Sequence, residues 1–127
     1  MIGIDSDCII DFLRGKKEAI DVVKKYQDEL VTTEINVFEI YYGIYINNAV
    51  KEEKYAEMFF NSLEVLNVNS WGAKAAKIFT DVTKQGKTIE QNDCLIASTL
   101  LMGGCNKIIT KNVAHFSRIK EIQVLNY

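Results

Sequence analysis

Three acidic residues stand in or beside apolar runs of the sequence. Asp5 directly follows the short apolar run 2–4, Glu39 lies inside a long apolar run, and Asp93 opens another one. A carboxylate that is buried without a partner is destabilising or takes up a proton, so such positions suggest a chemical task. Each acid also has an ordinary explanation. Asp5 and Asp93 are good helix N-caps, and Glu39 could reach solvent or a tyrosine hydroxyl.

Taken together, the three carboxylates suggest a metal site. If they converge, their mutual repulsion requires either protons or a cation between them. Carboxylate oxygens without cysteine or paired histidine ligands select hard ions such as Mg²⁺ or Mn²⁺. Such ions activate water and stabilise the transition state of phosphoryl transfer. Convergence cannot be derived from spacing, because positions 5, 39 and 93 are far apart in the chain.

Two further polar residues lie near the end of the chain. Asn112 belongs to the polar turn 110–112, which follows a predicted strand and is either an ordinary turn or part of the same site. His115 is the only histidine, which excludes a ribonuclease that uses two histidines as acid and base. We expect His115 to lie at the surface or at an edge, with contact to a substrate as the alternative.

The elements that must position these residues alternate between strands and helices. Short apolar or β-branched runs predict strands at 2–4, 30–33, 64–68, 107–110 and 123–125. Apolar residues at helical spacing predict helices at 8–13, 16–29, 36–50, 51–62, 71–85 and from about 93 to 102. Ser6 or Asp7 is the expected N-cap of the first helix, and Asn92 or Asp93 that of the last. This alternation favours an α/β fold with a mostly parallel sheet, in which ligands bind beyond the carboxyl ends of strands.

Two helices are predicted to be largely buried. The helix that carries Glu39 is apolar nearly all round, and the helix that follows Asp93 is apolar on most sides. Tyr41, Tyr42 and Tyr45 lie at helical spacing, which favours a place in the core or in an interface over stacking on bases.

Length and composition narrow the class of protein. The 127 residues (14.5 kDa) are enough for one domain, predicted to span residues 1–127. The longest apolar stretch of low charge, 94–105, is too short to cross a membrane, and no secretory signal is visible. Three cysteines without C-x-x-C spacing are expected to be buried and reduced, which indicates the cytoplasm.

The charge balance argues against a dedicated non-specific nucleic-acid binder. The formal net charge is −2, whereas such proteins usually carry a basic surplus. The charge is unevenly spread, because residues 94–127 sum to +3 and residues 1–93 therefore to −5. The overall value can mislead if several acids are gathered in one site.

Four segments then follow one another in a characteristic order. They are IDSDCIIDFLRG (4–15), TEINVFEIYYG (33–43), GKTIEQNDCLIA (86–97) and TKNVAHF (110–116). No single segment is specific, but all four in this order closely resemble the PIN-domain family, and in particular the VapC-type toxins of prokaryotic toxin–antitoxin pairs. The resemblance covers the whole chain.

The resemblance implies a fold, an activity and partners. The fold would be a three-layer α/β/α, Rossmann-like arrangement with a parallel sheet of four or five strands. The family's acidic metal ligands fall on Asp5, Glu39 and Asp93, with Asn112 where many members carry a fourth catalytic acid. The implied activity is endonucleolytic cleavage of RNA that depends on Mg²⁺ or Mn²⁺. The implied partners are an inhibitory antitoxin and a second copy of the chain, and none is a membrane.

The sequence departs from the family pattern at two places. Asp7 stands where Asn is common, so it either adds a carboxylate or caps the first helix. Neither Asn112 nor His115 is acidic, which weakens the side where a second metal ion would bind. The loss of the fourth acid keeps open a PIN-like module that binds RNA or protein without cutting.

A second enzyme class also fits the opening of the chain. In a haloacid-dehalogenase-like phosphatase, Asp5 would be the nucleophile and Asp7 the acid. No later acidic pair follows a strand to hold Mg²⁺, and that class leaves Glu39 and Asp93 without a role. If the chain is a nuclease, both a toxin and an RNA-processing enzyme fit its residues.

Overall fold

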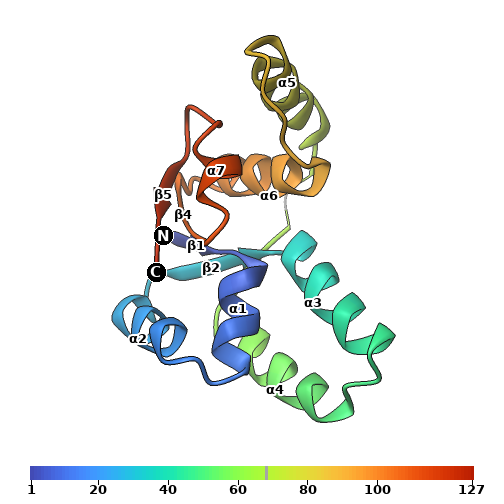
Figure 1. The fold of residues 1–127 in the computed structure, drawn as a ribbon, viewed down its shortest axis with the longest axis vertical. Coiled ribbons are helices and arrows are strands. Elements are labelled where there is room, and N and C mark those ends of the chain that lie inside the picture. The colour runs from blue at the N-terminus through green and yellow to red at the C-terminus, as the bar shows by residue number, and fades with distance from the viewer. Residues whose placement is uncertain (68) are drawn as a thin grey trace.

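The computed structural model describes residues 1–67 and 69–127 and has a five-stranded parallel sheet at its centre (Figure 1). The strands lie in the order β3-β2-β1-β4-β5. Their bounds are β1 Ile2–Ile4, β2 Leu30–Thr33, β3 Glu64–Leu66, β4 Lys107–Ile109 and β5 Gln123–Leu125. All neighbouring strands pair in parallel, and the order reverses at β1, between β2 and β4. In parallel sheets a binding site forms where the strand order reverses.

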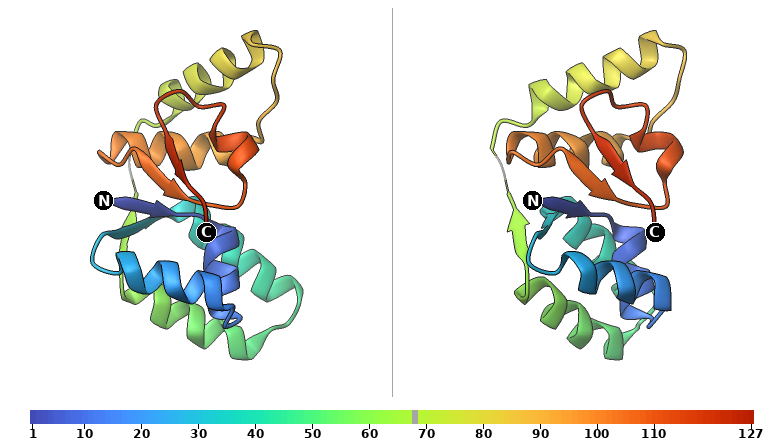
Figure 2. Two further views of the ribbon diagram at one scale, coloured as in Figure 1. Left: turned by 60° about the vertical axis from the view of Figure 1, so that its left-hand side comes forward. Right: turned by 90° about the vertical axis from the view of Figure 1, so that its left-hand side faces the viewer.

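Helices cover both faces of this sheet, which gives the three layers (Figure 2). One face carries α1 (Ser6–Leu13), α2 (Lys17–Tyr26), α3 (Glu34–Ile46) and α4 (Val50–Asn61). The other face carries α5 (Gly72–Lys84), α6 (Gln91–Met102) and α7 (Val113–Phe116). Each interface has its own apolar cluster, with Ile4 and Ile9 in the first and Ile96 and Ile108 in the second. The predicted three-layer α/β/α fold is confirmed.

Helix α6 approaches the sheet closely at Gly3 in β1. A Cβ atom at this position would lie 2.7 Å from a methyl carbon of Leu100 and 3.0 Å from the carbonyl oxygen of Lys107. The absence of a side chain therefore lets α6 pack directly on the central strand. This packing matters for the site, because α6 carries Asp93.

The predicted elements are confirmed, with corrections at their ends. The strand predicted at 64–68 ends at Leu66, and Val68 lies outside the described residues. The N-cap of α1 is Asp5, one residue before the predicted caps, because its side chain accepts the Ser6 N–H. The N-cap of α6 is Glu90, so Asn92 and Asp93 lie in the first turn of that helix. The short helix α7 was not predicted, since four residues are too few to show a period.

The prediction that α3 is buried on most faces is wrong. Ile40 and Ile44 face the core, whereas Phe38, Tyr42, Tyr45 and Ile46 are exposed. Periodicity cannot show this, because the helix is apolar on both sides and only packing decides which side is covered. By contrast, α6 is buried along most of its length, as predicted.

The state of the cysteines and the length of the helices were also predicted from the sequence. Cys8, Cys94 and Cys105 are buried and free, as predicted. Within residues 1–67 and 69–127, no helix combines the length and apolar character that crossing a bilayer requires.

Candidate functional site

The three predicted acids come together at the carboxyl edge of the central strands. Asp5 directly follows β1, Glu39 lies on α3 and Asp93 lies in the first turn of α6. Ser6 links two of them, because its hydroxyl donates to Glu39 Oε1 at 2.8 Å while its backbone N–H donates to Asp5 Oδ1 at 2.9 Å. The acids are close enough that the charge of Asp93 acts on both Asp5 and Glu39. The fold therefore brings together three carboxylates that the sequence keeps far apart.

Asp5 is deeply buried, with only 6% of its surface exposed, the same fraction as Asp93. Its Oδ2 accepts a hydrogen bond from the Thr110 hydroxyl at 2.8 Å, and its Oδ1 accepts one from Asn36 Nδ2 at 3.2 Å. These bonds favour the charged form, but burial and the nearby charge of Asp7 raise the pKa of Asp5 to about 7. The charged form of Asp5 is therefore unfavourable in the folded chain.

Asp93 is held in place from the loop after β4. Asn112 Nδ2 donates to Asp93 Oδ2 at 3.0 Å, and His115 Nδ1 lies 2.9 Å from the same oxygen. Burial raises the pKa of Asp93 above its ordinary value, although the His115 hydrogen bond opposes that change. Both side chains contact Oδ2 and so fix the orientation of the Asp93 carboxylate. His115, predicted at the surface or at an edge, lies at this edge of the sheet with its ring half-buried against Asp93.

Glu39 lies at the rim of the same cluster and is half-buried. Burial raises its pKa, while the Ser6 hydroxyl and a polar contact from Asn92 partly offset that effect. The three acids thus share raised pKa values, for which burial is in each case the main cause.

Two uncharged residues organise the cluster and were not singled out from the sequence. Asn36, only 1% exposed, accepts from the Thr33 hydroxyl at 2.7 Å and turns its amide N–H groups toward Asp5 and Ser6. Thr110, also buried, donates to Asp5 and accepts the Asn112 N–H at 2.9 Å. A buried amide must have hydrogen-bond partners. An asparagine at the start of a mostly apolar helix was therefore the sequence signal that could have indicated the supporting role of Asn36.

Asp7 forms a clamp between α1 and the loop after β4. Its Oδ1 accepts the Cys8 N–H, and its Oδ2 accepts the Lys111 N–H at 2.9 Å and the Thr110 hydroxyl at 3.2 Å. Asp7 therefore joins the start of α1 to the loop after β4. Its charge still adds to the repulsion at Asp5.

The donor set fits a hard divalent cation. Asp5, Glu39 and Asp93 offer oxygen atoms only, and burial makes their charged forms unfavourable without a cation. Among residues 1–67 and 69–127, however, no three histidine, cysteine or acidic side chains form a ready-made set of ligands. The acids instead point to hydrogen-bond donors of the protein. Small side-chain rotations would have to accompany the binding of an ion.

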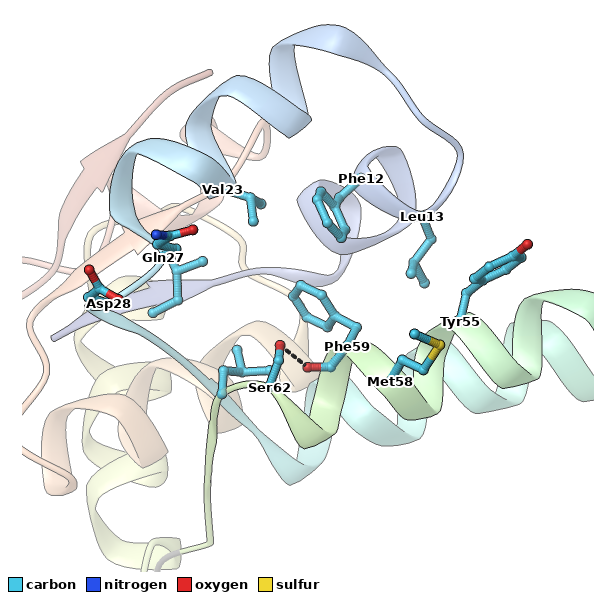
Figure 3. Close-up of a pocket in the computed structure, with 11 residues that line it drawn as sticks. Phe12, Leu13, Val23, Gln27, Asp28, Tyr55, Met58, Phe59 and Ser62 are labelled. Atoms are coloured by element: carbon cyan, nitrogen blue, oxygen red, sulfur yellow. Dashed lines mark hydrogen bonds between the residues drawn. The ribbon is translucent and has the colours of Figure 1, made fainter.

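An apolar cavity lies within the layer formed by the first helices of the chain (Figure 3). It has a volume of about 540 Å³ and lies between α1, α2 and α4. Apolar side chains line most of it, including Phe12, Met58 and Phe59. None of the three clustered acids borders it, so its size does not identify it as the place of the chemistry.

Comparison with known families decides what kind of domain this is. The family model of the PIN domain matches residues 2–122. The chain belongs to the PIN domain family. This family is distinct from the haloacid-dehalogenase-like phosphatases, so the alternative with Asp5 as nucleophile and Asp7 as acid is wrong.

Solved structures support the PIN fold over the full length of the chain. A chain of VapBC2 from Rickettsia felis, bound to a DNA fragment from their promoter, matches with a TM-score of 0.88 and 18% identity and covers 100% of this chain and 99% of that chain. A chain of DNA-bound VapBC from Salmonella typhimurium matches with a TM-score of 0.87 and 21% identity and covers 99% and 98%. VapBC-1 from nontypeable Haemophilus influenzae gives 0.83 and 24%, again covering 99% and 98%. A search of curated protein sequences finds no match.

A second acidic centre of this PIN domain is structural. Asp11 is buried in α1 and forms ion pairs with Lys16 Nζ at 3.0 Å and Lys111 Nζ at 2.8 Å. The Tyr127 hydroxyl donates to the same carboxylate at 2.8 Å. These contacts tie α1 to the start of α2, to the loop after β4 and to the segment after β5. The Lys111 hydrogen bond holds the pKa of Asp11 well below its usual range.

We therefore expect Asp11→Ala to lower the free energy of unfolding by about 2–3 kcal/mol near neutral pH. Because the folded-state pKa of Asp11 is depressed, this contribution is present above its ordinary pKa of 3.8 and is lost as the pH falls below it. Urea unfolding over a range of pH measures the effect. Asp81→Ala, which breaks an exposed pair with Lys77, is the control and should cost less than about 0.5 kcal/mol. Equal losses in the two variants would contradict this role.

Proposed function

We propose that this PIN domain, spanning residues 1–127, is a metal-dependent endoribonuclease that acts as the toxin of a toxin–antitoxin pair. One observation carries the proposal: three carboxylates from β1, α3 and α6 meet at the edge where the strand order reverses, and burial raises the pKa of each. A structural role alone does not explain three repelling acids in one place, because each destabilises the folded chain.

The proposed roles follow from the contacts of each residue. Asp5, Glu39 and Asp93 hold Mg²⁺ or Mn²⁺, which when bound supplies a Lewis acid and an activated water for cleavage of the phosphodiester bond. Asn112 and His115 fix the orientation of Asp93 through its Oδ2. Asn36 and Thr110 do the same for Asp5 from opposite sides. We also propose that the protein acts in the cytoplasm, which its three free thiols support.

The direct test is cleavage of RNA by the purified chain with and without a divalent ion. We expect cleavage with Mg²⁺ or Mn²⁺, none with a chelator, and recovery when the ion is restored. The ion should also raise the melting temperature, because it binds the folded state and relieves the repulsion between the acids. A clear rise in melting temperature without any cleavage would favour the non-catalytic module, whereas cleavage in the presence of chelator would refute metal dependence.

We propose an antitoxin as the protein partner. The structural neighbours are chains of VapBC and FitAB complexes, which supports a partner of this kind. The apolar cavity between α1, α2 and α4, together with the exposed side chains of Tyr55 and Met58, offers a surface for an apolar segment of that partner (Figure 3). A basic side chain of the same partner can neutralise the acids in place of the ion.

Binding of the antitoxin should therefore protect RNA. We expect the co-purified pair to cleave RNA at less than about one-tenth of the rate of the free chain. At a partner concentration of ten times its dissociation constant, only about one-tenth of the chain is left unbound and active. A time course of RNA cleavage at equal concentrations measures both rates. Equal rates for the pair and the free chain would exclude inhibition as the role of the partner.

We also propose that the chain forms a homodimer. Tyr45 and Ile46, at the C-terminal end of α3, are exposed apolar side chains that a second copy can cover. Analytical ultracentrifugation of the wild type and of Tyr45→Lys tests this assembly. The wild type should sediment as a dimer and the variant should shift toward the monomer.

A further inference from the structure

A second hollow lies at the same edge of the sheet as the acids. It has a volume of about 280 Å³ and lies between α3, the end of β3, the residue before α5 and α6. Two aromatic rings border it, those of Phe38 and Trp71, which are 62% and 42% exposed. Its polar lining includes Glu34, Asn67 and Asn92. The hollow thus combines exposed aromatic rings with carboxylate and amide groups that can form hydrogen bonds.

This hollow adjoins the acidic cluster at two places along the chain. Phe38 and Asn92 border the hollow, and each immediately precedes one of the acids, Glu39 on α3 and Asp93 on α6. Asn92 and Asp93 lie in the same first turn of α6. A molecule bound in the hollow would therefore lie next to the carboxylates that we assign to catalysis.

We propose that this hollow binds a nucleobase of the RNA, next to the phosphodiester bond that is cleaved. The proposal rests on the proposed function, because it assigns a subsite to the same reaction. Proteins that recognise single-stranded RNA stack its bases on aromatic side chains and read the base edges with hydrogen-bonding groups. Phe38 suits such stacking because its ring is itself supported by Tyr42, at 6.0 Å between the ring centroids and 26° between the planes.

The polar lining favours bases that carry an exocyclic amino group. The Glu34 carboxylate accepts hydrogen bonds only, so it pairs with the amino group of cytosine, adenine or guanine and repels the carbonyl oxygen that uracil offers in that place. The amides of Asn67 and Asn92 both donate and accept, which suits the remaining edge of any base. We therefore infer that the subsite prefers cytosine over uracil.

Two other occupants suit the hollow less well. A phosphate group would meet the charge of Glu34 and, beyond Asn92, that of Glu39. A second copy of the chain would have to bury Glu34, Asn67 and Asn92, and burying such groups without partners is costly. A neutral, flat molecule with its own donors and acceptors avoids both penalties.

Nuclear magnetic resonance provides a readout that does not depend on cleavage. Trp71 is the only tryptophan, so the indole N–H of the labelled protein gives one isolated signal. Cytidine and uridine, which contain no phosphodiester bond, are titrated separately into the chain in the presence of chelator. We expect a saturable shift of the indole signal, with cytidine binding about tenfold more tightly than uridine.

Three variants make the test specific. Phe38→Ala should weaken cytidine binding about tenfold, and Glu34→Gln should remove most of the preference for cytidine while the chain still binds both nucleosides. Phe79→Ala removes a comparably exposed ring on α5 outside the hollow and should change neither value. Circular dichroism confirms that each variant is folded.

The outcomes separate this inference from the proposed function. Nucleoside binding without any RNA cleavage would support the subsite and refute the nuclease. RNA cleavage together with an indole signal that neither nucleoside shifts, and an unchanged cleavage-site preference in Phe38→Ala, would refute the subsite alone. An indole shift that depends only on protein concentration would show that a second copy covers the hollow, which also overturns the proposal.

Discussion

Replacing Asp5 by asparagine is expected to abolish RNA cleavage and, at the same time, to stabilise the metal-free protein. The amide keeps an oxygen for the Ser6 N–H and Asn36, while the Thr110 hydroxyl can rotate to accept from the new amide group. Shape and packing are therefore retained. What disappears is a charge that is buried and repelled by Asp7, and we expect activity to fall by at least about a hundredfold.

The gain in stability has a distinctive dependence on pH. The pKa of Asp5 is raised from 3.8 to about 7 in the folded state. Below the lower value the carboxyl is protonated in both states, so the variant and the wild type should be equally stable. As the pH rises from there to about 7, only the unfolded chain gives up this proton, and the wild type loses stability. The advantage of Asp5→Asn should therefore grow over this range and level off at about 2–4 kcal/mol above it.

Thermal or urea unfolding in chelator, measured from about pH 4 to pH 8, follows this difference directly. Asp21→Asn on α2 changes an exposed acid in the same way and should show no such trend. If Asp5 were only a helix cap, asparagine would replace it with little change in stability or cleavage at any pH, since the two residues cap equally well. That result would refute the metal-site assignment.

The second large effect is expected at Glu39 and Asp93. Glu39→Gln and Asp93→Asn each remove one charged ligand, so each should lower RNA cleavage by at least about a hundredfold and weaken the rise in melting temperature that Mg²⁺ produces. The fold should survive in both variants. Glu39 is half-buried, and the amide that replaces the Asp93 carboxylate keeps an oxygen that can still accept from Asn112.

The losses should not add up. Once one ligand is missing, the ion is absent or misplaced, so the double variant Asp5→Asn/Asp93→Asn should cleave no more slowly than either single variant. Asp7→Asn is the matched control, because Asp7 links α1 to the loop after β4 and is not one of the three acids that we assign to the ion. It should lose some stability but keep most of its cleavage rate. Losses that multiply in the double variant would indicate that the acids act independently and not through one ion.

Several features of the fold could be predicted because they depend on local sequence. The run 2–4 is short, apolar and followed by Asp5, and it forms β1 as expected. The alternation of such runs with amphipathic segments is enough to predict a parallel sheet covered on both faces. The order of the four motifs was enough to identify the PIN domain family, which the match over residues 2–122 shows.

Helix ends and short elements were less predictable. Glu90, rather than Asn92 or Asp93, precedes the first helical residue of α6, although its side chain makes no capping hydrogen bond. A choice among three neighbouring polar residues depends on how the preceding segment approaches the helix, and no local propensity records that approach. The exposed stripe of α3 has a similar cause, since only the packing of its other face against the core leaves Phe38 and Tyr42 uncovered.

The sequence by itself determined which residue types are present and in which local elements they lie. It therefore identified Asp5, Glu39 and Asp93 as acids in apolar surroundings. Only the tertiary structure decided that these acids meet, that His115 turns inward to Asp93, and that Asn36 and Thr110 support Asp5. The physical reason is that hydrogen bonds and charge repulsion act over a few ångströms in space, and packing of the sheet and helices sets those distances between residues that are distant in the chain.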